Sequence, residues 1–198
     1  MEFINTLKAS FNLLTLDDES YDYIKENKIS KRNFIFLFFL FLILQMIPAS
    51  LDVLNTKSIA YKPWIVFSTS LSYILGIFFV LYLFAFVFSK LFDKKDSLSL
   101  YNIFLLVSFP CYALGCIFNT LFVLIFSDMQ SFVFTAFYVI SAIFVLLPLF
   151  LLGVLNLFLL INYGSKFLEI SKLKMTLSFL SVFIVLFILI IFLGFVFL

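Results

Sequence analysis

The chain contains no histidine and only two cysteines, and 12% of its 198 residues are charged against 65% that are hydrophobic. A soluble domain of this size would need far more polar surface. The sequence has no Cys/His cluster and no phosphate-cradling Gly-x-x-x-x-Gly-Lys loop. Cys111 and Cys116 lie five residues apart on one expected helix, so they point in different directions and cannot pair. We therefore expect a membrane protein with no metal site and no cofactor.

Five stretches, 18 to 31 residues long, carry no charged side chain, and about 20 residues suffice to cross a bilayer as a helix. The sequence therefore predicts an all-α, polytopic membrane bundle of five transmembrane helices over residues 34–198. Residues 1–33 form a short cytoplasmic N-terminal segment. The expected spans are 34–51, 64–89, 102–127, 132–162 and 175–198.

The lysines and arginines predict the orientation. Eleven of the thirteen precede the first span or fall between spans two and three or four and five, and only Lys57 and Lys62 fall elsewhere. Basic residues beside spans are held on the cytoplasmic side, so the N-terminus is expected in the cytoplasm and the C-terminus outside or in a lumen. We expect no cleavable signal peptide, because the first 33 residues are polar. The eleven are Lys8, Lys25, Lys28, Lys31, Arg32, Lys90, Lys94, Lys95, Lys166, Lys172 and Lys174.

The N-terminal segment predicts two short helices. Residues 3–14 place Phe3, Ile4, Leu7, Phe11 and Leu14 within one arc of about 100° on a helical wheel. Such a helix either lies in the headgroup plane with this apolar side down or packs on the end of the bundle. Residues 15–18 (TLDD) have the composition of a helix start, and the second helix should end near residue 27.

Small and polar side chains in spans two to four predict where the helices pack, because close approach and polar contacts drive helix association in lipid. The fifth span is mostly Phe, Ile, Leu and Val and should face lipid. The prolines within spans either free backbone carbonyls for a polar pocket or hinge, or form static kinks. The candidate packing or polar-interior residues are Ser68, Ser72, Gly76, Pro110, Gly115, Asn119, Thr120, Ser141, Pro148, Gly153 and Asn156.

Four tyrosines fall within spans, where a buried hydroxyl usually needs a partner, so we expect them to face neighbouring helices. They are Tyr73, Tyr82, Tyr112 and Tyr138. No span contains a charged residue, which argues against proton-coupled transport and intramembrane hydrolysis. No loop between spans is long enough to hold a soluble active site. We therefore expect a protein that is not an enzyme, has no catalytic residue and does not bind nucleic acid.

Two stretches carry a resemblance to a known family. Residues 90–110 (KLFDKKDSLSLYNIFLLVSFP) combine a short polar turn with a helix that leads to a proline within span three, and residues 18–25 (DESYDYIK) form a small amphipathic entry helix. With the order of segments, this pattern resembles the Yip (Ypt-interacting protein) family of five-span membrane proteins, in a prokaryotic type. The resemblance implies vesicle trafficking, Rab-type GTPase partners and membrane shaping, although the cytoplasmic segment here is short.

Two functions remain open at this stage. The first is a non-enzymatic membrane scaffold or adaptor that organises lipid or protein partners through its cytoplasmic face. The second is a facilitator, or transporter subunit, for a neutral or lipid-like solute, with a polar path that includes Gln45, Ser72 and Asn156. A third interpretation of the polar amides is that they serve only to bond one helix to another. The residue usage, rich in Lys, Asn, Ile and Phe, suits an AT-rich genome and a prokaryotic cell membrane.

Overall fold

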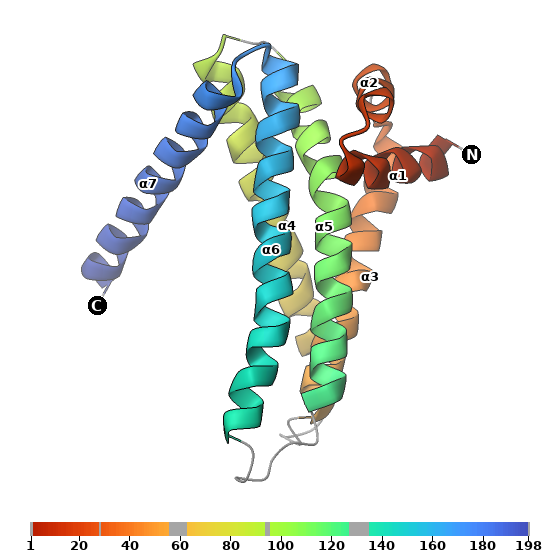
Figure 1. Cartoon of the computed structure of the whole chain (residues 1–198), viewed down its shortest axis with the longest axis vertical. Helices are drawn as coiled ribbons and strands as arrows, with labels where there is room; N and C mark the ends of the chain where they lie inside the picture. The colour runs from red at the N-terminus through yellow and green to blue at the C-terminus, as the bar shows by residue number, and fades with distance from the viewer. Residues whose placement is uncertain (1, 28, 56–62, 94–95, 127–134, 198) are drawn as a thin grey trace.

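The computed structural model describes residues 2–27, 29–55, 63–93, 96–126 and 135–197, and these residues form helices and short connections without a strand (Figure 1). Most of the helices coincide with the long uncharged runs, in which the backbone must satisfy its own hydrogen bonds. The elements are α1 (Glu2–Asn12), the 3₁₀ turn η1 (Leu13–Thr15), α2 (Asp18–Glu26), α3 (Lys31–Asn55), α4 (Pro63–Leu91), α5 (Ser97–Phe126), α6 (Thr135–Leu168) and α7 (Lys172–Phe197).

Four helices are long and apolar enough to cross a membrane, which makes the chain a multi-pass, all-helical membrane protein. They contain the segments Lys31–Leu51, Pro63–Leu91, Ser97–Leu124 and Leu146–Leu168. The fifth expected span, residues 175–198, coincides with α7, in which most side chains beyond residue 185 lie outside the described part. Five crossings therefore stay a prediction.

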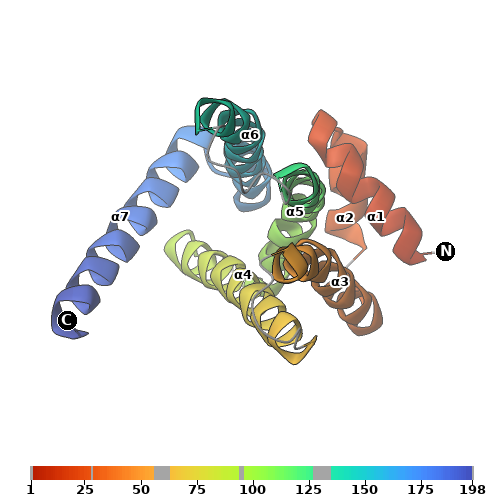
Figure 2. The same ribbon diagram turned by 90° about the horizontal axis from the view of Figure 1, so that it is seen from below.

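Helix α5 is the centre of the bundle. It packs against α3, α4 and α6, whereas α4 and α6 have little contact with each other over the described residues. Over an 18-residue apolar stretch of its span 72% of the residues are buried, against 22–33% over such a stretch in the other three. Helix α7 packs on α6 and touches α4 near its start, where the ring of Phe179 lies 4.6 Å from that of Phe88. From there α7 runs away from the bundle (Figures 1 and 2).

The basic side chains gather at one end of the bundle. Helices α4 and α6 end there, and α3, α5 and α7 begin there, beside α1 and α2 (Figure 1). We call this the capped end. The structure thus brings together the three segments for which the lysine pattern predicted a common side. The basic residues described at this end are Lys8, Lys25, Lys31, Arg32, Lys90, Lys166, Lys172 and Lys174.

The small-residue stripe predicted as the packing face of α4 is not its buried face. Ser68 is half-buried, Ser72 is exposed, and a Cβ on Gly76 would meet no atom within 4 Å. The helix is rotated so that large side chains fill the space toward α3 and α5, because rings bury far more area than serine or glycine. The buried residues of α4 are Val66, Ser70, Ile74, Phe78, Leu81, Phe84, Ala85, Phe88 and Ser89.

The tyrosines within the spans differ in how far they are exposed. Tyr73 and Tyr82 of α4 are exposed, yet each faces a neighbouring helix in part: the Tyr82 ring meets that of Tyr101 of α5 edge-on at 5.6 Å, and Tyr73 lines a hollow together with Gln45 of α3 and Tyr112 of α5. Tyr112 does face a neighbour, as predicted, since its hydroxyl donates to Gln45 of α3. The side chain of Tyr138 lies outside the described part.

Candidate functional site

The N-terminal cap, which we define as α1, η1 and α2 (residues 2–26), lies against the bundle at the capped end (Figures 1 and 2). Its buried residues in α1 are the small Thr6, Ala9 and Ser10, which allow close approach to α5. Ile4 is 68% exposed and Phe11 is 41% exposed, so the apolar arc predicted from the sequence is only partly used in this contact. Of the two arrangements left open for this helix, the structure shows packing on the bundle.

Ser10 fills a gap in the backbone of α5. In an α-helix the N–H of residue 110 would bond to the carbonyl of residue 106, but Pro110 has no N–H. The Ser10 hydroxyl donates to this Leu106 carbonyl instead, and Ser10 is fully buried. The carbonyl freed by Pro110 therefore fixes the position of the N-terminal cap. This contact favours a static structural role for Pro110 over a hinge.

Replacing Ser10 with alanine should loosen the N-terminal cap by about 1–2 kcal/mol, because a buried carbonyl then has no donor. In a protein that already carries Pro110→Ala, replacing Ser10 with alanine should destabilise the cap less, because the N–H at residue 110 can then bond to the Leu106 carbonyl within α5. Hydrogen exchange of the α1 amides in the four members of this double-mutant cycle measures both effects. If Ser10→Ala causes the same loss with and without Pro110→Ala, the coupling between the two residues is contradicted.

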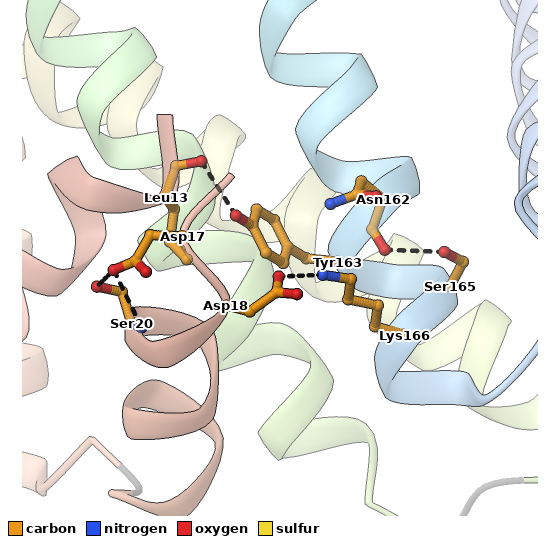
Figure 3. Close-up of polar contacts among 8 residues, drawn as sticks. All are labelled: Leu13, Asp17, Asp18, Ser20, Asn162, Tyr163, Ser165 and Lys166. Atoms are coloured by element: carbon orange, nitrogen blue, oxygen red, sulfur yellow. Dashed lines mark hydrogen bonds and ion pairs between the residues drawn. The ribbon is translucent and has the colours of Figure 1, made fainter. Parts of the chain in front are cut away.

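The end of α6 makes the second contact with the cap (Figure 3). The Tyr163 hydroxyl donates to the Leu13 carbonyl at 3.1 Å, and the Tyr163 ring stacks on Tyr21 with centroids 5.3 Å apart. The Lys166 ammonium lies 5.4 Å from the centre of the Tyr163 ring and pairs with Asp18. Asp18 is exposed, so this ion pair adds little. The stacked rings and the Leu13 contact hold the cap in place.

Helix α2 begins as the sequence predicts. The Asp17 carboxylate accepts a hydrogen bond from the Ser20 N–H at 3.3 Å and so caps the helix, which ends before Asn27. Tyr21 packs inward from its first turns, and burial, with smaller contributions from Asp22 and Glu169, raises its pKa to about 12. The phenol therefore stays uncharged at physiological pH.

A polar groove runs between α1 and α2. Its volume is about 330 Å³, and it carries a lysine as well as two carboxylates. Charges of both signs suit a protein surface of complementary pattern better than a phosphate backbone. We call it the cap groove, and its lining residues are Asn5, Lys8, Ala9, Asn12, Asp17, Glu19, Ser20 and Tyr23.

The second hollow region lies within the bundle. Two adjoining hollows, of about 420 and 240 Å³, share Tyr112, Gly115 and Leu149, and we call them together the membrane cavity. The larger hollow is also lined by Gln45, Tyr73, Cys116 and Asn119. The smaller hollow is also lined by Phe41, Ile77, Leu81, Ser108, Cys111, Leu152, Gly153 and Asn156.

No family model, curated protein or solved structure matches this chain. The likeness to the Yip family therefore stays a resemblance of sequence pattern. Within the described part of the chain, neither the cap groove nor the membrane cavity contains a group of side chains that could hold a metal ion.

The candidate residues named from the sequence fall into three groups. Gly115, Asn119, Gly153 and Asn156 line the membrane cavity. Pro110 is buried beside the N-terminal cap, while Thr120 bonds to the carbonyl of Cys116 in its own helix and Pro148 is half-buried in α6. Ser68, Ser72 and Gly76 line neither hollow, and the side chain of Ser141 lies outside the described part.

Sequence reasoning missed Ser10 and Ser108. Pro110 signals that a carbonyl four residues earlier needs a donor, but nothing in the sequence pairs it with Ser10, 96 residues away from Leu106. Ser108 sits in an apolar run, where a serine hydroxyl commonly bonds within its own helix. Only the packing of α5 against its neighbours shows that it lines a cavity.

Proposed function

We propose that the chain is a non-enzymatic membrane scaffold or adaptor, similar to the Yip family, that meets a protein partner from the cytoplasm through its N-terminal cap. In this proposal the chain crosses the membrane five times, with α7 as the fifth span and the C-terminus outside or in a lumen. The gathering of basic residues at the capped end supports this orientation, because such residues are held in the cytoplasm.

The observation that carries the proposal is the cap groove on a cap that is held against the bundle. Ser10, Leu13 and Tyr21 attach the cap to α5 and α6, so the groove keeps a defined shape. A preformed surface costs less conformational entropy on binding than a disordered tail. Lys8 and Glu19 give this surface charges of both signs with which to select a protein partner.

Photo-crosslinking in native membranes tests the adaptor. A photoreactive side chain at position 12, in the cap groove, should give a discrete protein adduct, and Lys8→Glu should reduce that adduct by about tenfold, because a like charge opposes the partner. Lys25→Glu is the matched control, since Lys25 lies on α2 outside the groove. An adduct that Lys8→Glu leaves unchanged, or the absence of any adduct, would contradict the proposal.

The membrane cavity favours a second candidate, a facilitator or transporter subunit for a neutral or lipid-like solute. The cavity lies among four helices of the bundle, and all the residues that line it are uncharged. Its polar side chains, among them Asn119 and Asn156, offer hydrogen bonds to a solute without the cost of a buried charge.

A further inference from the structure

The two hollows of the membrane cavity differ in how their polar groups are satisfied. In the larger one the Gln45 side-chain oxygen accepts from the Tyr112 hydroxyl at 2.7 Å and from the Cys116 thiol at 3.9 Å. These groups bond one helix to another, as the simplest interpretation of a buried amide predicts. The polar groups that lack a hydrogen-bond partner line the smaller hollow.

Two polar atoms at the smaller hollow have no partner among the described residues. Ser108 is only 5% exposed, its hydroxyl bonds to no described protein group, and it lines this hollow. The Oδ1 atom of Asn156, across the hollow on α6, is enclosed and equally unpartnered. Leaving such groups unpaired away from water costs free energy, so a molecule that bonds to both would be stabilised there.

The smaller hollow opens sideways. Its wall includes Gly153, which is exposed on α6, where an added Cβ would meet no atom within 4 Å. Leu81 of α4 lines the other wall, and α4 and α6 have little contact over the described residues. Helix α7 contacts α4 through Phe179 and Phe183, and beyond these residues its ribbon runs away from the bundle (Figure 2). A lipid can therefore reach the hollow from the bilayer.

Depth and charge limit the kind of lipid. Ser108 is the seventh residue of the expected span 102–127, so it lies about 9 Å along the helix from the capped end of that span at 1.5 Å per residue, inside a hydrocarbon core of about 30 Å. A phosphate at this depth would need a cationic partner, and the lining residues are all uncharged. A hydroxyl or ester reaches the same depth at far lower cost.

We propose that the smaller hollow binds one uncharged glycerolipid of the diacylglycerol class. Its free hydroxyl donates to Asn156 Oδ1, the Ser108 hydroxyl donates to an ester carbonyl, and the acyl chains leave past Gly153 into the bilayer. This proposal deepens the second candidate function by naming the class of solute, and it requires binding without requiring transport. It is independent of the adaptor and its cap groove.

The test uses the full chain reconstituted in phosphatidylcholine vesicles that contain a photoreactive, clickable diacylglycerol. Labelling should map to peptides of α5 and α6 and should be competed by unlabelled diacylglycerol. Gly153→Leu should reduce labelling by at least about tenfold, because the new side chain fills the opening. Asn156→Leu should reduce it about fivefold, the value of one lost hydrogen bond.

Gly76→Leu is the matched control. Gly76 is equally exposed, has no atom within 4 Å of an added Cβ, and lies on α4 outside both hollows, so labelling should be unchanged. Equal melting temperatures of the three variants and the parent protein establish that the fold is retained. Equal labelling by a phosphatidylcholine probe would show only lipid at the surface, and full labelling of Gly153→Leu would place the lipid elsewhere. Either result overturns the proposal and leaves the cap crosslinks unaffected.

Discussion

Replacing Gly164 with leucine is expected to force α6 away from α5 and α7 and to destabilise the bundle by about 1–3 kcal/mol or more. Gly164 lies where the three helices meet. An added Cβ would stand 2.5 Å from Met175 Cε and 3.0 Å from Phe104 Cε1. The methionine can move, but the Phe104 ring is fully buried among its neighbours and cannot yield without displacing α5. Thermal unfolding of the purified protein in lipid measures the loss.

The matched control for Gly164 is Gly76→Leu, which adds the same side chain to another membrane helix where no atom lies within 4 Å of the new Cβ. Its melting temperature should stay at that of the parent protein. Gly164→Ala should fall between the two, because a single methyl mainly requires that Met175 shift. A leucine at position 164 that leaves the melting temperature unchanged would mean that the three helices are not in close contact there.

Replacing Tyr163 with alanine is expected to release the N-terminal cap from α6. The side chain is fully buried, its ring stacks on Tyr21, and its hydroxyl holds the Leu13 carbonyl. Losing an aromatic ring from such a position costs about 3–5 kcal/mol, far more than one hydrogen bond. Limited proteolysis in the connection between α2 and α3 should become much faster, while α4 and α5 remain protected.

Tyr163→Phe separates the two contributions of this tyrosine. It keeps the ring against Tyr21 and removes only the hydrogen bond to the Leu13 carbonyl, so it should weaken the attachment of the cap by about 1 kcal/mol. If Tyr163→Phe and Tyr163→Ala speed proteolysis equally, the hydroxyl and not the ring holds the cap.

The sequence was most informative where one physical requirement dominates. Uncharged runs must become helices in lipid, and the lysine pattern predicted which connections share one end of the bundle. The capping oxygen of Asp17 could also be predicted, because a few neighbouring residues determine where a helix begins.

Helix rotation was not predictable from small residues. Ser72 and Gly76 form a regular stripe, yet Phe78 and Phe88 on another face of α4 are the buried residues. The choice between two faces depends on the shapes that α3 and α5 present, which no pattern within α4 contains. The same limit applies to Ser108 and Asn156, since a cavity is a property of several helices together.

The contacts of the N-terminal cap also have a consequence for the order of folding. Ser10 bonds to a carbonyl 96 residues later in the chain, and Leu13 accepts from a tyrosine 150 residues later. The residues of the N-terminal cap leave the ribosome before their partners, so they must wait until α5 and then α6 have been synthesised and inserted. Until then, Thr6, Ala9 and Ser10 cannot pack against α5, and the synthesis of Tyr163 is the event that allows the N-terminal cap to reach its final position.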